Sequence, residues 1–212
     1  MTGLLFITHQ TDRYTYLQSV EIALQGGCRQ IQLRMKDVSP AEVEKVGIEA
    51  KKMCDDFDAK LYIDDHVEVC KNILATGVHL GKQDMLPSEA RKILGNKFII
   101  GGTANTFEDI VRLKNEGVDY IGLGPFRFTN TKKNLSPIIG LEGYDRIMKQ
   151  CKEQQIDLPV FAIGGITNAD IANIIKTGVS GIALSSTILT AENPVEETKR
   201  IINMNCWAKG EW

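Results

Sequence analysis

The chain has 212 residues, of which 43% are hydrophobic and 25% are charged, so it can bury a sizeable core and has no marks of disorder. Its 25 Lys and Arg residues and 27 Asp and Glu residues are scattered and leave a net charge of -2. This balance gives no electrostatic case for binding nucleic acid or an anionic membrane, so we expect small-molecule partners.

Short apolar or β-branched runs alternate along the chain with longer amphipathic segments. We predict eight strands, at residues 4–8, 30–34, 60–63, 77–80, 98–101, 120–124, 160–164 and 181–185. Helix starts are predicted at Ser39-Pro-Ala-Glu42, Asn105-x-x-Glu108 and Thr167-x-x-Asp170, which have the spacing of a capping box. Helix ends are predicted at Gly27, Gly77, Gly117 and Gly178.

Eight strand and helix units in about 200 residues, with strands that need cover on both faces, indicate an α/β fold. We predict one (β/α)8 TIM-barrel domain over residues 1–212. A doubly wound open sheet is the alternative. It would more usually have a glycine-rich turn after the first strand, but the segment there is ITHQTDR.

Cysteine usage and the N-terminal sequence bear on the cellular compartment. The five cysteines are widely spaced and form no C-x-x-C pair, which argues against a disulfide framework and a zinc cluster. The apolar run near the N-terminus is too short for a signal peptide or a membrane span. We therefore expect a cytoplasmic protein with no membrane role.

The active site of a TIM barrel lies at the C-terminal ends of its strands. Gly164-Gly165 follows the seventh predicted strand, and Ser185-Ser186 follows the eighth. Small residues at that position let backbone N–H groups approach a phosphate closely, so these four residues predict a monophosphate site. The alternative is that the glycines only turn the chain and the serines only cap a helix.

The loop after the sixth predicted strand carries polar groups suited to phosphate. Thr129 and Thr131 offer hydroxyl donors, and Lys132 or Lys133 offers a cation. The alternative for this segment alone is a polar surface loop.

A second anion site is predicted at the ends of the second, third and fourth strands. It combines the cations Arg34, Lys36 and Lys132 with the carboxylates Asp65 and Asp84, to which Asp64 could be added. Carboxylates would repel a bare phosphate, but they fit a diphosphate that Mg²⁺ bridges to the protein. The alternative is a set of salt bridges on the barrel rim.

Nothing in the sequence predicts a nucleophile or a histidine base. His79 lies within a predicted strand, as a packed core histidine would, and no G-x-S-x-G elbow is present. The site is therefore expected to act by electrostatics and positioning.

Several motifs together resemble the thiamine phosphate synthase family, in the same order along nearly the whole chain. They are Gln32-Leu-Arg34-x-Lys36, Asp64-Asp65, Gly77-Val-His-Leu-Gly-x-x-Asp84, Gly122-x-Gly-Pro-x-x-x-Thr129-x-Thr131-Lys132-Lys133, Gly140-Leu-Glu142 and Ala162-Ile-Gly-Gly165-Ile. The resemblance implies a transferase that condenses 4-amino-2-methyl-5-(diphosphooxymethyl)pyrimidine with 4-methyl-5-(2-phosphooxyethyl)thiazole, giving thiamine phosphate and diphosphate.

The resemblance also implies roles for individual residues. The pyrimidine diphosphate would be held by Gln32, Arg34, Lys36, Thr103 and Lys132, and Asp65 and Asp84 would bind Mg²⁺. Asp64 is counted as a further substrate-binding residue. The thiazole phosphate would be held by Thr129, Thr131, Gly164, Gly165, Ser185 and Ser186. Arg34, Lys36 and Lys132 would be catalytic, because they stabilise departing diphosphate before the thiazole nitrogen attacks a pyrimidine-methyl cation.

Two positions depart from the family pattern. Asp64 stands where asparagine is usual, so a group that could donate a hydrogen bond is replaced by one that only accepts unless it is protonated. Thr103 stands where serine is common, and there the hydroxyl is kept.

Two other functions remain as alternatives. The related thiazole tautomerase shares the barrel but is expected to carry a histidine after the fifth strand, where this chain has Gly101-Gly-Thr-Ala-Asn105. A barrel that binds phosphorylated ligands without turnover is the other, because one fold can host many functions. The sequence leaves the oligomeric state unknown.

Overall fold

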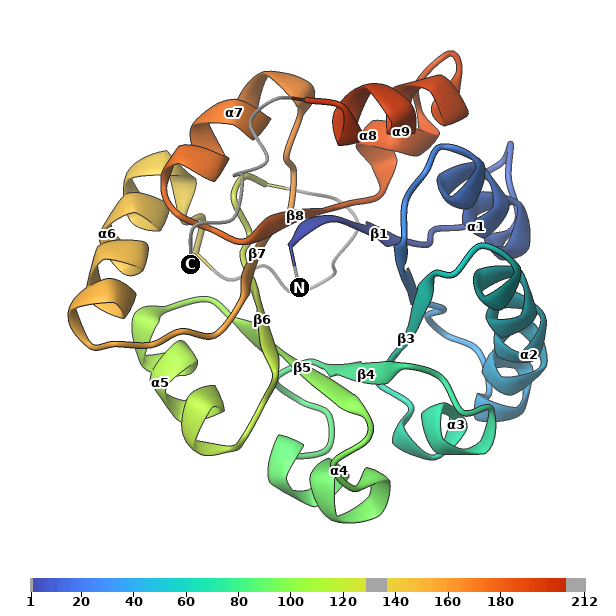
Figure 1. The fold of residues 1–212 in the computed structure, drawn as a ribbon, viewed down its shortest axis with the longest axis horizontal. Coiled ribbons are helices and arrows are strands. Elements are labelled where there is room, and N and C mark those ends of the chain that lie inside the picture. The colour runs from blue at the N-terminus through green and yellow to red at the C-terminus, as the bar shows by residue number, and fades with distance from the viewer. Residues whose placement is uncertain (1, 129–136, 205–212) are drawn as a thin grey trace.

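The computed structural model describes residues 2–128 and 137–204, which form a closed barrel of eight parallel strands (Figure 1). The strands are β1 (Gly3–Ile7), β2 (Gln30–Leu33), β3 (Lys60–Asp64), β4 (Gly77–Leu80), β5 (Ile99–Ala104), β6 (Tyr120–Leu123), β7 (Val160–Ile163) and β8 (Gly181–Leu184). Each strand pairs with the next in the sequence, and β8 pairs with β1 to close the sheet. The predicted (β/α)8 TIM barrel is confirmed.

The helices surround the barrel as an outer ring (Figure 1). They are α1 (Tyr16–Gln25), α2 (Pro40–Asp56), α3 (Val67–Asn72), α4 (Pro87–Leu94), α5 (Phe107–Asn115), α6 (Gly140–Glu153), α7 (Asn168–Lys176), α8 (Ser186–Leu189) and α9 (Pro194–Ile202). Among the residues that the structure describes, no helix is long and apolar enough to span a membrane.

The predicted fifth strand ended too early. β5 extends to Ala104, three residues beyond the predicted end at Gly101, and so it includes Thr103. Gly101 and Gly102 both lie within the strand, where packing requires glycine. A Cβ atom on Gly101 would lie 2.1 Å from the Tyr120 ring, and one on Gly102 would lie 2.6 Å from Leu113.

Two of the three predicted helix starts are confirmed. Ser39 caps α2 by accepting from the Glu42 N–H, and Thr167 caps α7 in a capping box with Asp170. The third was wrong by one residue, because Thr106 rather than Asn105 caps α5. The Asn105 amide donates instead to the carbonyl of Gly124.

Three of the four predicted helix-ending glycines follow helices. Gly27, Gly117 and Gly178 come after α1, α5 and α7 with φ values of 92°, 78° and 95°, which favour glycine. The prediction for Gly77 was wrong, because α3 ends at Asn72 and Gly77 begins β4. A Cβ atom there would lie 2.0 Å from the carbonyl oxygen of Ile99 on the neighbouring strand.

Large side chains fill the inside of the barrel. Tyr120 lies at the centre of this layer, with its ring edge-on to Tyr62 and Phe161 at centroid distances of 5.7 and 5.9 Å. Leu5, Ile7 and Ala183 complete the cluster. The barrel is therefore a packed core rather than a pore, and polar side chains gather beyond it at the strand ends.

The four cysteines within the described residues, Cys28, Cys54, Cys70 and Cys151, are buried free thiols. Burial raises the pKa of Cys28 to about 11 and that of Cys70 to about 12. These thiols are therefore protonated at neutral pH and unreactive, in keeping with packing roles.

Candidate active site

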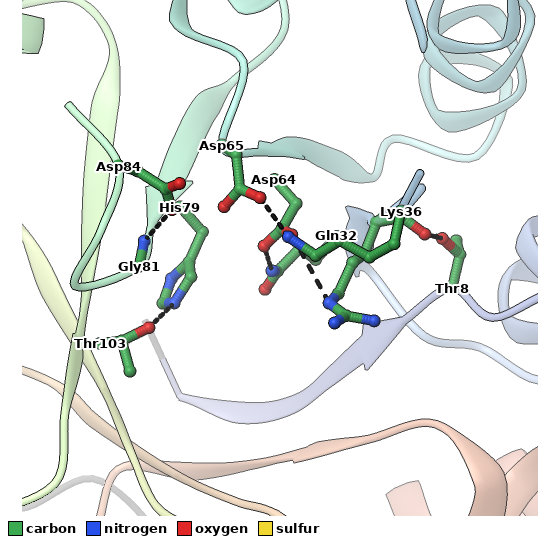
Figure 2. Close-up of polar contacts among 10 residues, drawn as sticks. Thr8, Gln32, Lys36, Asp64, Asp65, His79, Gly81, Asp84 and Thr103 are labelled. Carbon is green, nitrogen blue, oxygen red and sulfur yellow. Dashed lines mark hydrogen bonds and ion pairs between the residues drawn. The ribbon is translucent and has the colours of Figure 1, made fainter. Parts of the chain in front are cut away.

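Polar side chains from neighbouring strands converge at the carboxyl ends of β2 to β5 (Figure 2). Gln32 and Asp64 lie within the last two residues of β2 and β3, and Thr103 lies near the end of β5. Arg34, Lys36, Asp65 and Asp84 lie in the segments that follow β2, β3 and β4. The structure thus brings together the described residues that were predicted to hold a diphosphate and a metal.

Asp64 is the buried centre of this group, with 7% of its surface exposed. Its Oδ1 accepts from the Gln32 amide at 2.6 Å, and its Oδ2 lies 3.0 Å from Lys36 Nζ and 3.6 Å from Arg34 Nε. Burial raises the pKa of the Asp64 carboxyl, the charge of Asp65 adds to the rise, and the two cations oppose it. Asp64 therefore orients Gln32 and offsets part of the positive charge.

Thr8, which the sequence did not single out, fixes the segment that carries Arg34. The Arg34 N–H donates to Thr8 Oγ1 at 2.9 Å, and the Thr8 hydroxyl lies 3.2 Å from the Arg34 carbonyl oxygen, to which it donates. The first predicted strand ended at Thr8, but nothing in its sequence distinguishes this contact from the ordinary preference of threonine for strands.

Asp65 and Asp84 form a pair of close carboxyls. Lys36 Nζ contacts Asp65 Oδ2, and Asp84 Oδ2 accepts from the Gly81 N–H at 2.6 Å (Figure 2). Burial raises the pKa of Asp84 to about 6, and both a hydrogen bond to Asp65 and the negative charge of Asp65 add to the rise. Burial also acts to raise the pKa of Asp65, but hydrogen bonds from Asp84 and Lys36 outweigh it and lower that pKa.

This carboxyl pair offers the oxygen donors that Mg²⁺ prefers. Within residues 2–128 and 137–204, no three or more His, Cys, Asp or Glu side chains are arranged as a set of metal ligands supplied by the protein alone. Mg²⁺ is usually bound by only one or two carboxylates, with substrate phosphate oxygens and water completing its shell. Two adjacent carboxyls that repel each other when both are ionised are a suitable oxygen donor set for it.

His79 connects the barrel interior to the site. Its Nδ1 lies 3.0 Å from the Tyr120 hydroxyl, and its Nε2 lies 3.0 Å from Thr103 Oγ1. The expectation of a packed histidine is confirmed, since the residue is buried. Its contact with Thr103 was not predicted, because the sequence could not show that the two side chains point toward the same side of the sheet.

A separate corner is formed at the ends of β7 and β8. Gly164 and Gly165 follow β7 with φ values of 95° and 68°. Ser185 precedes α8, and its hydroxyl oxygen is buried with no hydrogen-bond partner among the described residues. Leaving a buried hydroxyl without a partner is costly, and this one lies at the corner where a monophosphate was predicted. Ser186 is the first residue of α8.

The predicted site residues Thr129, Thr131 and Lys132, together with Lys133, lie outside the described residues.

Comparison with known proteins gives the family. The family profile described as "Thiamine monophosphate synthase" matches residues 4–188. The chain belongs to this family. A protein of Bacteroides thetaiotaomicron named "Thiamine-phosphate synthase" is 60% identical, over 96% of this chain and 98% of its own length. A protein of the same name from Methanococcus maripaludis is 37% identical, over 88% of this chain and 86% of its own length.

The family membership agrees with the fold. The solved structure titled "Thiamine phosphate pyrophosphorylase from Pyrococcus furiosus" matches with a TM-score of 0.81 and 33% identity, over 95% of each chain. The resemblance seen in the sequence motifs is thereby confirmed. The chain is a transferase of the thiamine monophosphate synthase family, with a role in thiamine biosynthesis.

Proposed function

We propose that the chain condenses 4-amino-2-methyl-5-(diphosphooxymethyl)pyrimidine with 4-methyl-5-(2-phosphooxyethyl)thiazole to form thiamine phosphate and diphosphate. One observation carries the proposal: the mixed cluster of cations and carboxylates on β2 to β4 is distinct from the glycine and serine corner on β7 and β8. Two sites of different charge suit one diphosphate and one monophosphate. The names of the relatives support the same reaction.

The first site would bind the pyrimidine diphosphate. Arg34 and Lys36 present their cations beside Asp64 and Asp65, and diphosphate oxygens would take over part of these contacts. Gln32 and Asp64 would position the pyrimidine, and Thr103 would donate its hydroxyl to the same substrate. Asp65 and Asp84 would hold Mg²⁺, which supplies charge stabilisation for the diphosphate that leaves.

The chain would act through charge and alignment rather than through a nucleophile. As the bond between the pyrimidine methylene carbon and the diphosphate oxygen breaks, its electrons leave with diphosphate, whose added charge Arg34, Lys36 and Lys132 stabilise. The thiazole nitrogen then uses its lone pair to form the new C–N bond to the pyrimidine-methyl cation. Gly164, Gly165, Ser185 and Ser186, with Thr129 and Thr131, would align the thiazole through its phosphate.

The reaction is tested with purified protein, both substrates and Mg²⁺. We expect diphosphate and thiamine phosphate to appear in equal amounts, with no diphosphate released from either substrate alone. Isomerisation of a thiazole without diphosphate release would instead favour the tautomerase. A rise in melting temperature with substrates but without turnover would favour a binding protein that does no chemistry.

Asp64→Asn is expected to tighten binding of the pyrimidine diphosphate. The amide oxygen can still accept from Gln32, but Arg34 and Lys36 lose one opposing charge. Because Lys36 is 42% exposed, its attraction to the buried Asp64 carboxylate contributes only up to about 1 kcal/mol, so KM for this substrate should fall by up to about fivefold. Steady-state kinetics measure the change.

The matched control for this substitution is Asp55→Asn, which removes an aspartate paired with Lys51 within α2. It should leave KM unchanged. A rise in KM for Asp64→Asn would show that the carboxylate contributes to binding through orientation rather than by offsetting charge.

Thr103→Val is expected to lower kcat/KM by about tenfold, and Thr103→Ser should keep most of the activity. Valine has a similar shape but cannot form a hydrogen bond with His79 Nε2 or donate to substrate. Losing a partly buried hydrogen bond costs about 1–2 kcal/mol. Steady-state kinetics of both variants test this, and equal activities would show that the Thr103 hydroxyl has no role.

A further inference from the structure

The turn at Gly164 and Gly165 is held on one side by Arg127, a residue that follows β6. The Arg127 N–H donates to the Gly164 carbonyl oxygen at 2.9 Å. The Arg127 guanidinium donates through Nη1 to the Gly165 carbonyl oxygen, also at 2.9 Å. Two successive carbonyl groups of the turn are therefore bound by a single residue.

These contacts determine the direction of two N–H groups. In a planar trans peptide, the C=O and the N–H point in opposite directions. Both peptides of the turn are trans, so the N–H groups of Gly165 and Ile166 are directed away from Arg127. Neither of them donates to another described residue. They are thus two adjacent donors, which is the arrangement that binds a phosphate oxygen in a backbone nest.

The turn also lies beside the buried hydroxyl of Ser185. The Thr187 hydroxyl of α8 donates to the Ile166 carbonyl oxygen at 2.5 Å, which ties the turn to the start of α8. Ser185 immediately precedes that helix, and its oxygen has no partner among the described residues. Two independent observations therefore indicate an anionic ligand at this corner.

Glycine at position 165 permits the close approach of Arg127. A Cβ atom on Gly165 would lie 3.0 Å from both the Cβ and the carbonyl oxygen of Arg127, and 2.9 Å from the carbonyl oxygen of Phe128. The φ of 68° also favours glycine. The glycine pair thus lies between two groups: its N–H groups face the proposed ligand, and its carbonyl groups face the Arg127 segment.

Asp170 fixes the Arg127 guanidinium in this position. Its two carboxylate oxygens accept from Arg127 Nη1 at 2.8 Å and from Nη2 at 2.9 Å. Asp170 is itself fixed, because its Oδ2 also accepts from the N–H and the hydroxyl of Thr167 at the start of α7. Hydrogen bonds from Arg127, and then from Thr167, lower the pKa of Asp170, so the pair is ionised at neutral pH.

The geometry points to Arg127 as a positioning residue for the monophosphate of the thiazole substrate. Its guanidinium acts through the Gly165 carbonyl with Asp170 as its anchor, while its backbone N–H, which the substitutions below keep, holds the Gly164 carbonyl. This inference rests on the proposed function. Arg127 does not touch the phosphate. Its role is to keep the N–H groups of Gly165 and Ile166 oriented for the ligand, so that no binding energy is spent on reorganising the turn.

The test is the kinetics of Arg127→Ala and Arg127→Lys with each substrate varied separately. For Arg127→Ala, we expect KM for the thiazole phosphate to rise about tenfold, since one charge-assisted hydrogen bond is lost. KM for the pyrimidine diphosphate and kcat at saturation should stay within about twofold of wild type. Arg127→Lys should be intermediate, because an ammonium cannot form the bidentate pair and also reach Gly165.

The matched control is Arg200→Ala. Arg200 has 51% of its side chain exposed, against 49% for Arg127, and it forms a similar pair with Glu197 on α9. This substitution should leave both KM values unchanged. Titration calorimetry with the thiazole phosphate and with its alcohol gives a second readout, and Arg127→Ala should weaken binding of the phosphate only.

Each outcome decides between the two proposals. If the wild-type protein releases no diphosphate from the two substrates, the proposed function fails. If the wild type is active but Arg127→Ala raises both KM values alike, or changes only the melting temperature, the positioning role is overturned and the pair is structural. If Arg127→Ala does not fold, Asp170→Asn and Arg127→Lys are used in its place. Both should raise KM for the thiazole phosphate and leave KM for the pyrimidine diphosphate unchanged.

Discussion

Replacing Asp84 with alanine is expected to lower kcat at least about 100-fold, which corresponds to about 2.7 kcal/mol of transition-state stabilisation. Asp65 follows β3 and Asp84 follows β4. Their carboxyls lie close together and are the proposed Mg²⁺ ligands. Without Asp84, one of the two carboxylates is lost, and stabilisation of the departing diphosphate falls. Diphosphate release at saturating Mg²⁺ measures the effect.

The matched control is Glu89→Ala. Glu89 is an exposed carboxylate in the first turn of α4, five residues from Asp84 along the chain, and its removal should leave kcat unchanged. An Asp84→Ala protein that keeps more than about a third of wild-type activity would show that Asp84 is not needed for the reaction.

Metal removal tests the same site without a mutation. A chelator is expected to abolish diphosphate release by the wild-type protein, and added Mg²⁺ should restore it. Asp84→Ala should need a higher Mg²⁺ concentration for half-maximal rate, because it has one ligand fewer. Full activity in the chelator would contradict the proposed role of Asp65 and Asp84, while leaving the fold and the family unaffected.

Most of the barrel could be predicted because strand and helix signals alternate regularly along the chain. The exceptions at glycines have a common cause, which is packing against another element. The fifth strand was predicted to end at Gly101, but it continues through Gly102, and the absence of side chains at both positions leaves room for Tyr120 and Leu113. Gly77 was read as a helix end, but it lies against β5. The register of neighbouring strands shows the needs of Gly77 and Gly101, and the packing of α5 against β5 shows that of Gly102.

The site could be predicted to the extent that it depends on strand ends. Arg34, Asp65 and Asp84 were grouped because the carboxyl ends of neighbouring parallel strands meet, and the structure places them together. The contact from His79 to Thr103 was missed, because apolar residues on both faces of parallel strands hide which side chains point inward.

The Arg127 contact to Asp170 was missed for a different reason. It joins residues 43 positions apart, one in a loop and one in a helix, and no periodicity relates them. The capping box at Thr167 gave Asp170 a sufficient role of its own, so the sequence contained no sign that its carboxylate has a second partner.

Phe161→Ala is expected to reduce the free energy of unfolding by about 3–5 kcal/mol. The Phe161 side chain is fully buried inside the barrel, with its ring edge against Tyr120, so its removal leaves a cavity among large aromatic rings. Urea denaturation followed by circular dichroism measures the loss, which should appear as a lower midpoint with an unchanged slope. The control is Phe57→Ala, since Phe57 is 38% exposed and its removal should cost about 1–2 kcal/mol, clearly less than the core substitution.

Phe161→Ala should also lower activity, because its contacts lead to the active site. Tyr120 rests on Phe161 and contacts His79, and His79 in turn contacts Thr103. A cavity at position 161 gives the Tyr120 ring room to move, so the Thr103 hydroxyl loses part of its orientation and kcat/KM should fall at temperatures where the variant is still folded. If stability falls but kcat/KM does not, the barrel interior supports the fold without helping to position Thr103.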